Sequence, residues 1–171
     1  MGLFDIFCPN ERNSSAYQID YEEFYNRGYR GVIFDVDNTL VKHGAPADEK
    51  SRELFLRLKN LGMKAIILSN NGKARVKSFA EDAGDVMYIH MANKPFKSGY
   101  IKAMEKMGTD VSTTMFVGDQ IFTDIIGAKR LGIYCILTEP IDEKEEIQIV
   151  LKRRAENVVL EMIDKKEKKS S

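Results

Sequence analysis

Four short groups of polar residues recur along the sequence, and each follows closely after a run of apolar residues. In chain order the groups contain Asp35, Asp37 and Thr39, then Ser69 and Asn70, then Lys94, and finally Asp119 and Asp124. Carboxylates can ligate a divalent cation or attack phosphorus, while an ammonium group and hydroxyls can hold phosphate oxygens. These residue types therefore suit chemistry on a phosphate group, provided that the fold brings the groups together.

The carboxylates predict a metal site. Several carboxylates that share one pocket repel one another unless a cation lies among them, and oxygen ligands with room for water suit Mg²⁺. Mn²⁺ accepts the same oxygen-rich octahedral site, so the sequence does not separate the two ions. Of Asp35 and Asp37, one carboxylate could attack phosphorus, and the other could protonate the leaving oxygen and later activate water.

Each of these residues also has an ordinary structural explanation. An Asp at the end of a strand is usually a turn former or a helix N-cap, and Asp124 could simply cap a helix. Ser69 with the two following asparagines could be only a turn, and Lys94 alone could be a solvated lysine. Thr39 and His43 are possible substrate contacts, although His43 could equally occupy a loop without a role. The conjunction of four groups favours the functional interpretation.

The elements that would position these groups alternate along the chain. Continuous apolar runs predict strands that are buried on both faces, at residues 31–36, 64–69, 86–90, 113–118 and 132–138. Between them, apolar residues spaced by three and four predict helices. Their stripes are Leu54, Phe55, Leu58 and Leu61; Val76, Phe79, Ala80 and Ala83, closed by Gly84; and Ile101, Met104 and Met107, closed by Gly108. We also expect helices at 124–131 and at about 143–163.

The alternation of strand and helix predicts an α/β fold with a doubly wound, mostly parallel, five-stranded sheet. We expect one domain over residues 1–171, with an N-terminal segment (1–30), a core (31–138) and a C-terminal helix with a charged tail (139–171). Open parallel sheets bind ligands beyond the carboxyl ends of their strands. The four polar groups should therefore meet at that edge.

The N-terminal segment contains a predicted short helix, capped by Asp20 three residues before Glu23 and ended by Gly28. Four tyrosines recur here at every fourth position, namely Tyr17, Tyr21, Tyr25 and Tyr29. Such a stripe could line a substrate entrance, but packing against the sheet is the favoured interpretation.

Composition limits the classes of partner. The chain has 171 residues, of which 43% are hydrophobic, and 26 basic residues balance 26 acidic ones. This balance gives no signature of nucleic-acid or membrane binding, and no run approaches a spanning helix. Cys8 and Cys135 are too few for a disulfide framework, which suits a cytoplasmic protein. The apolar N-terminal patch, at residues 1–10, allows at most peripheral contact with the inner face of a membrane.

Four motifs, in this order, resemble the signatures of the haloacid dehalogenase (HAD) superfamily. They are DVDNTLV (35–41), ILSN (67–70), NKPF (93–96) and VGDQIFTD (117–124). The first resembles the signature DxDx(T/V), the third resembles the lysine motif, and the fourth is a very specific match. The resemblance extends over about residues 31–138.

The resemblance implies a role for each polar group. Asp35 is the nucleophile that becomes aspartyl-phosphate, and Asp37 is the general acid and base. The phosphoryl group is bound by Ser69, Asn70 and Lys94. The ligands of Mg²⁺ are Asp35, Asp37 through its backbone carbonyl, Asp119, and Asp124 directly or through water. The implied activity is a Mg²⁺-dependent phosphatase acting on a phosphomonoester.

HAD phosphatases select substrates with cap domains inserted after the first motif or between the second and third. Here 31 residues separate Asp37 from Ser69, and 24 separate Ser69 from Lys94, which leaves room for the helix and strand of the core alone. The resemblance therefore implies an uncapped, open site. Uncapped members act on large or surface-bound substrates, or borrow a lid from a neighbouring subunit, so a homo-oligomer is possible.

The whole chain, including residues 1–30 and the loop ANKPFKSGY, is most similar to the YqeG-type phosphatases of subclass IIIA. That group is related to phosphatidylglycerophosphate phosphatases, which makes a phospholipid head group a candidate substrate. A soluble sugar phosphate or another small phosphate is the alternative.

Two other classes of protein share parts of this pattern. Receiver domains also phosphorylate an aspartate in the presence of Mg²⁺, but their acidic metal pair closes the first strand and the acceptor lies on a later one. An inactive HAD scaffold could serve as a module that binds a phosphorylated ligand. Because every expected catalytic position is filled, the sequence favours an enzyme.

Overall fold

The computed structural model describes residues 2–142, together with residues 154 and 158. Its centre is a six-stranded sheet in the order β1-β6-β5-β2-β3-β4, and every neighbouring pair is parallel. The strands are β1 (Glu11–Asn13), β2 (Gly31–Phe34), β3 (Lys64–Leu68), β4 (Met87–Ile89), β5 (Thr114–Gly118) and β6 (Tyr134–Thr138). The predicted doubly wound α/β class is confirmed.

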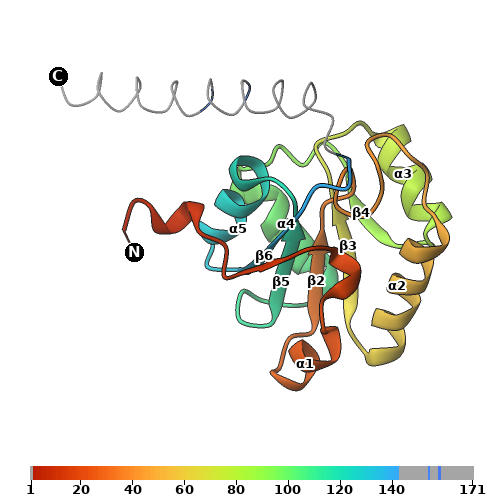
Figure 1. The fold of residues 1–171 in the computed structure, drawn as a ribbon, viewed down its shortest axis with the longest axis horizontal. Coiled ribbons are helices and arrows are strands. Elements are labelled where there is room, and N and C mark those ends of the chain that lie inside the picture. The colour runs from red at the N-terminus through yellow and green to blue at the C-terminus, as the bar shows by residue number, and fades with distance from the viewer. Residues whose placement is uncertain (1, 143–153, 155–157, 159–171) are drawn as a thin grey trace.

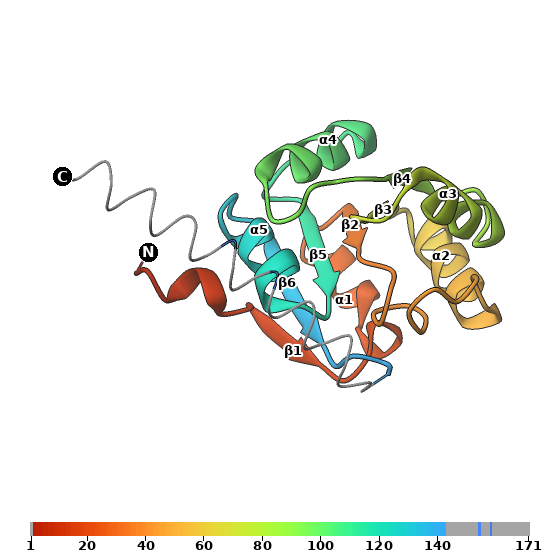
Figure 2. The same cartoon turned by 90° about the horizontal axis from the view of Figure 1, so that it is seen from above.

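Helices lie on both sides of the sheet (Figures 1 and 2). The α-helices are α1 (Tyr21–Asn26), α2 (Glu49–Leu61), α3 (Lys73–Asp82), α4 (Lys97–Met107) and α5 (Ile126–Lys129). Two short 3₁₀ turns, η1 (Asp5–Phe7) and η2 (Ala16–Gln18), precede α1, and a π-helical turn, η3 (Ile121–Ile125), leads directly into α5. Among the described residues no helix is long and apolar enough to cross a bilayer.

The central strand β2 shows why both sides need a covering layer. Successive side chains of a strand point to opposite faces, so Val32 and Phe34 enter one core while Ile33 enters the other. The first core is completed by apolar residues of α1, α2 and α3, and the second by residues of α4 and α5. A fully buried parallel sheet therefore produces the continuous apolar runs of the sequence.

Capping residues set the helix boundaries much as predicted. Asp20 caps α1 by accepting a hydrogen bond from the backbone N–H of Glu23. The tyrosine stripe that follows Ser15 packs against the first core, and the Tyr17 hydroxyl donates to the carbonyl of Leu40 at 2.6 Å. The packing interpretation of the stripe is therefore confirmed.

The sheet has one strand more than the five predicted. Residues Glu11–Asn13 form β1, which pairs with β6 in register from Glu11 opposite Ile136. This strand is polar and only three residues long, and it is held by backbone pairing at the sheet edge. It therefore lacks the apolar run from which the other strands were predicted.

Three further predictions need correction. The strand at 86–90 lies at an edge of the sheet, so β4 is half-buried instead of covered on both faces. Ile101 is exposed, because α4 turns Tyr100, Ala103 and Met104 towards the second core. The fourth helical segment begins at Ile121, before Asp124. Of the helix predicted at 143–163, the structure describes only residues 154 and 158, and both are helical.

The parallel register places the ends of three strands at one level. Phe34 of β2 lies opposite Ile67 of β3 and Val117 of β5. The chain therefore reaches Asp35 beside the last residues of both neighbouring strands, and the Asp35 N–H donates to the carbonyl of Val117. Between β2 and β3 the regular elements are limited to α2, and between β3 and β4 to α3, in agreement with the absence of a cap domain.

Candidate active site

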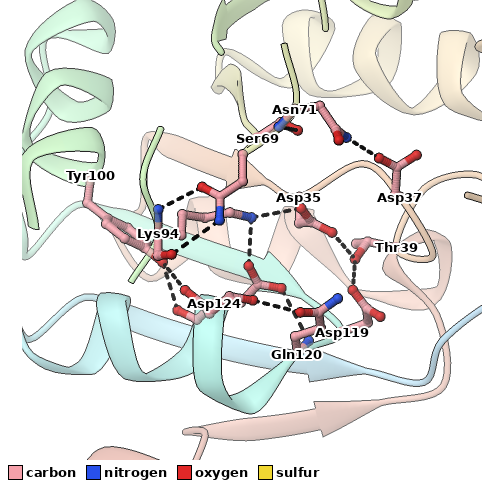
Figure 3. Close-up of polar contacts among 12 residues, drawn as sticks. Asp35, Asp37, Thr39, Ser69, Asn71, Lys94, Tyr100, Asp119, Gln120 and Asp124 are labelled. Atoms are coloured by element: carbon pink, nitrogen blue, oxygen red, sulfur yellow. Dashed lines mark hydrogen bonds and ion pairs between the residues drawn. The ribbon is translucent and has the colours of Figure 1, made fainter. Parts of the chain in front are cut away.

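Lys94 is at the centre of the polar residues at this edge (Figure 3). Its Nζ atom lies 2.7 Å from Oδ1 of Asp35 and 2.7 Å from Oδ1 of Asp124. The lysine is only 7% exposed, and Asp124 is equally well buried. Three segments that are distant in sequence thus bring two carboxylates and one ammonium into direct contact.

Asp119 joins this cluster through Thr39. The Thr39 hydroxyl oxygen lies 3.2 Å from Oδ2 of Asp35 and 3.0 Å from Oδ1 of Asp119, so it bridges the two carboxyl groups. Asp35, Asp119 and Asp124 each present a carboxylate oxygen within 4.8 Å of the other two. Thr39, predicted as a possible substrate contact, holds the carboxyl groups of this cluster together.

The electrostatics of the cluster favour a bound cation. With all groups ionised, three carboxylates and Lys94 sum to −3 + 1 = −2. Burial, together with the negative charges of Asp35 and Asp124, raises the pKa of Asp119 to about 9. Burial also raises the pKa of Asp124 to about 6, although Lys94 opposes this shift. The protein without metal therefore retains protons where a divalent cation would neutralise the carboxylates.

The donor set fits Mg²⁺ or a similar hard cation. Three carboxylate oxygens within 4.8 Å of one another are the type of ligand that such ions prefer, and the residual charge matches a divalent ion. Lys94 keeps its proton, because the attraction of Asp124 and Asp35 outweighs burial and raises its pKa. It can therefore serve as a second positive group beside the ion.

Asn70 fixes the loop that carries Lys94. Its Oδ1 accepts a hydrogen bond from the Lys94 N–H at 2.7 Å, and its Nδ2 donates to the Lys94 carbonyl at 3.1 Å. Two backbone hydrogen bonds, from Ala92 to Ser69 and from Met91 to Asn71, join the same loops. The side chain of Asn70 is thus used to position Lys94, and its predicted contact with phosphate stays a prediction.

Asp37 points away from the carboxylate cluster (Figure 3). Its Oδ1 accepts hydrogen bonds from Arg75 Nη2 and from the Gly44 N–H, each at 2.9 Å, and its Oδ2 accepts one from the side chain of Asn71. Burial acts to raise the pKa of Asp37, but the hydrogen bonds from Arg75 and Gly44 outweigh it and lower the pKa. A metal contact through the backbone of Asp37 stays a prediction.

The π-helical turn η3 shapes the side of the site that carries Asp124. The Gln120 N–H donates to Oδ2 of Asp124 at 3.2 Å, and the Tyr100 hydroxyl donates to the carbonyls of Thr123 and Asp124. A β-carbon on Gly118 would lie 2.5 Å from Oδ2 of Asp124, so the site requires glycine there. π-Helical turns often occur at functional sites.

The remaining predicted residues lie at the border of the cluster. Ser69 is buried, and its hydroxyl accepts a hydrogen bond from the Asn71 N–H at 3.2 Å. His43 is exposed, and its charge contributes to lowering the pKa of Asp37.

Arg75 was not among the predicted site residues, and Asn71 was noted only as part of the polar stretch after the second strand, although both contact Asp37. A usable signal existed, because α3 begins directly after the second polar group, and its first turn must face the same edge of the sheet.

Comparison with known proteins agrees with this arrangement. Residues 44–132 match the family of haloacid dehalogenase-like hydrolases. The chain is 32% identical over 165 residues to "Probable phosphatase YqeG" of Bacillus subtilis, covering 96% of this chain and 95% of that protein. It is 31% identical over 160 residues to the phosphatidylglycerophosphate phosphatase 1 of Arabidopsis thaliana, covering 83% of this chain and 44% of that protein.

Solved structures share the fold at lower identity. A protein from Corynebacterium glutamicum superimposes with a TM-score of 0.54 at 23% identity, over 72% of this chain and 93% of that one. A protein from Listeria monocytogenes gives a TM-score of 0.54 at 22% identity, over 67% and 84% of the two chains. These likenesses support the fold of the core. The chain therefore belongs to the haloacid dehalogenase-like hydrolases, and within them to the phosphatases.

Proposed function

We propose that this phosphatase hydrolyses a phosphomonoester through an aspartyl-phosphate formed on Asp35, with Mg²⁺ as its metal ion. The observation that supports this proposal best is the contact of Lys94 with both Asp35 and Asp124 at 2.7 Å, beside the carboxyl group of Asp119. A nucleophile, a buried ammonium and a site for a divalent cation lie within one small cluster. Phosphoryl transfer depends mainly on such positioning and charge stabilisation.

In the first step an oxygen of Asp35 forms a bond to phosphorus while the bond from phosphorus to the leaving oxygen breaks. Asp37, which takes up a proton from solvent before this step, gives that proton to the leaving oxygen, which departs as an alcohol. In the second step Asp37 takes a proton from water, the water oxygen attacks phosphorus, and the bond to Asp35 breaks with release of inorganic phosphate. Lys94 and Ser69 hold the phosphoryl oxygens.

Asp119 and Asp124, with Asp35, would hold the metal ion. When bound, the ion neutralises charge on the phosphoryl oxygens and lowers the repulsion between the substrate and Asp35. Thr39 keeps the carboxyl groups of Asp35 and Asp119 in place through its two contacts. Lys94 balances part of the negative charge through its contacts with Asp35 and Asp124.

The substrate class that we propose is a phosphomonoester on a lipid head group, such as phosphatidylglycerophosphate, reached by a cytoplasmic protein at a membrane surface. The loop that carries Lys94 supports this choice, because its flanking residues Met91 and Phe96 are 69% and 45% exposed. An exposed apolar rim next to a phosphate site suits a head group at the boundary of a bilayer. The named activity of the plant relative points to the same class.

The test is release of phosphate from a panel of substrates by the full chain. The panel contains phosphatidylglycerophosphate in mixed micelles, sugar phosphates, nucleotides and phosphoproteins, each with Mg²⁺ or EDTA. We expect Mg²⁺-dependent turnover that prefers the lipid, and Asp35→Asn should lower kcat at least about a thousandfold. Asp85→Asn is the matched control, since Asp85 is an exposed carboxyl on a turn.

The outcomes separate the parts of the proposal. Turnover that EDTA or Asp35→Asn leaves unchanged would reject the metal-dependent aspartyl-phosphate route. Equal activity on sugar phosphates, with none on the lipid, would reject the lipid while keeping the phosphatase chemistry. A stable phosphorylated protein without turnover would instead indicate a phosphoacceptor module.

A further inference from the structure

The carboxylate of Asp37 is held by three donors that belong to two segments. Gly44 lies in the loop that follows β2, whereas Asn71 and Arg75 follow β3. The contact with Arg75 is an ion pair of 2.9 Å, in which the Arg75 side chain is 24% exposed and that of Asp37 is 13% exposed. Such a half-buried pair is screened less by solvent than a surface pair.

Arg75 is itself anchored on a rigid element. It is the third residue of α3, and its guanidinium lies over the ring of Phe79, one helical turn later, at 5.6 Å from the ring centre. Phe79 is buried in the first core, so its ring cannot move freely. The charged end of Arg75 is therefore held by aromatic packing on one side and by Asp37 on the other.

Asp37 lies in a part of the chain with little regular structure. Residues 36–41 form a tight loop beyond β2, in which Val36 accepts the backbone hydrogen bonds of Thr39 and Leu40. Within the described residues, Arg75 is the ion-pair partner of Asp37. Removing the guanidinium would leave this carboxyl with two donors, one of them a loop amide, and would allow other side-chain rotamers.

We propose that Arg75 is a positioning residue that orients the acid–base carboxyl of Asp37 from helix α3. The inference rests on the proposed function, because it concerns the proton transfer assigned there to Asp37. Arg75 itself touches neither the leaving oxygen nor the phosphoryl group in this assignment. Its removal should therefore slow the protonation of the leaving group and leave the attack by Asp35 intact.

This role has a chemical signature that a loss of folding would not produce. An alkoxide leaving group needs a proton, whereas p-nitrophenolate departs readily without one. A misplaced acid should therefore lower kcat/KM, which reports the steps up to release of the leaving group, far more for an alkyl phosphate than for p-nitrophenyl phosphate. The second step, in which Asp37 activates water, is common to both substrates and affects kcat alone.

The experiment compares kcat and KM of the full chain with Mg²⁺ on these two substrates, using the best alkyl phosphate from the panel above. We expect Arg75→Leu to lower kcat/KM on the alkyl phosphate by about 10- to 100-fold, as for other residues that orient reactive groups, and on p-nitrophenyl phosphate by less than about 3-fold. Arg75→Lys should lose less activity than Arg75→Leu, because lysine keeps the positive charge but lacks the planar guanidinium group with its fixed N–H donors.

Two further variants serve as a reference for the loss of the acid and as a control for helix α3. Asp37→Asn should show the same leaving-group selectivity more strongly, and adding Arg75→Leu to it should cause little further loss. Lys77→Leu is the matched control, because Lys77 lies on the same helix, is exposed, and pairs only with Glu81 among the described residues. It should retain the selectivity of the wild type.

Each contrary outcome has a distinct meaning. An equal loss of kcat/KM on both substrates, or no loss in Arg75→Leu, would overturn the positioning role. So would a full additional loss when Arg75→Leu is combined with Asp37→Asn. If Asp37→Asn shows no leaving-group selectivity, the acid role in the proposed function fails, and the inference fails with it. A wild type inactive on every substrate would reject the proposed function first.

Discussion

The Nζ atom of Lys94 lies 2.7 Å from a carboxylate oxygen of Asp35, although the two residues are 59 positions apart in the chain. Asp124 contacts the same ammonium, and all three groups are well shielded from solvent. The metal-free site therefore depends on one lysine to balance its carboxylates.

Replacing Lys94 by Met should destabilise the protein most strongly when no metal is present. Removing one partner of a buried ion pair leaves uncompensated charge, so we expect the free energy of unfolding in EDTA near neutral pH to fall by about 3 kcal/mol. Mg²⁺ should reduce this loss because it supplies positive charge. Urea denaturation with and without Mg²⁺ measures both values. Lys102→Met, at an exposed position of α4, should change neither, and an unaltered Lys94→Met would contradict the prediction.

The stability of the metal-free protein should fall as the pH rises. Burial and nearby carboxylates raise the pKa of Asp119 to about 9, and burial raises the pKa of Asp124 to about 6, both above the ordinary value of 3.8 for this side chain. A raised folded-state pKa contributes stability that is complete below the unfolded pKa and is lost as the pH passes the folded one. We therefore expect Tm in EDTA to fall between about pH 5 and about pH 9. A Tm that stays flat or rises over this interval would be inconsistent with this account.

Stabilisation by Mg²⁺ should show the opposite trend. Binding must displace the proton of Asp119, so the increase in Tm at a fixed Mg²⁺ concentration should grow with pH over the same interval. Calorimetry in two buffers of different ionisation enthalpy would measure the released protons. Asp119→Asn should raise Tm in EDTA, because an amide at this buried position neither has to take up a proton on folding nor adds a charge beside Asp35 and Asp124, and it should weaken the response to Mg²⁺. Asp85→Asn, a substitution at an exposed carboxyl, should behave as the wild type.

Gly118→Ala should damage the metal site. The added β-carbon would lie 2.5 Å from Oδ2 of Asp124 and 2.8 Å from a ring carbon of Phe116. The Asp124 carboxyl cannot move without losing its contacts with Lys94 and the Gln120 amide. We expect Mg²⁺ affinity to fall by about 10-fold or more, in line with other changes that displace ligand groups. Gly72→Ala is the control, since a β-carbon added at Gly72 would have no neighbouring atom within 4 Å. Equal Mg²⁺ affinity in the two variants would refute the steric argument.

The exposed apolar side chains beside Lys94 should matter only for a lipid substrate. Replacing Met91 and Phe96 by Ser removes apolar surface without touching a polar contact of the site. We expect lower activity on phosphatidylglycerophosphate in vesicles and unchanged kcat/KM on p-nitrophenyl phosphate. Leu56→Ser is the matched control, because Leu56 is 58% exposed on α2. A parallel loss on both substrates would mean that the loop itself had been distorted.

Local patterns in the sequence were sufficient to predict most of the core. The apolar runs around Val32 and Phe116 had to become buried strands, because hydrophobic burial and backbone pairing are satisfied together in a parallel sheet. Helix signals such as the Asp20 cap act within a few residues, so they too could be predicted. The strand at Glu11–Asn13 has no such signal, since its pairing depends on an edge of β6 that exists only after folding.

The candidate site was also predictable only in part. Residue types and their places after apolar runs predicted that Asp35, Lys94, Asp119 and Asp124 would meet, because parallel strands bring their carboxyl ends to one edge. The direction of each side chain depended on packing between segments distant in sequence. Asn70 was needed to hold the backbone of Lys94, and Asp37 was oriented by Arg75 from α3. Such contacts are set by the geometry of neighbouring segments. The place of Arg75 in the first turn of α3, directly after the second polar group, was a local signal for one of them.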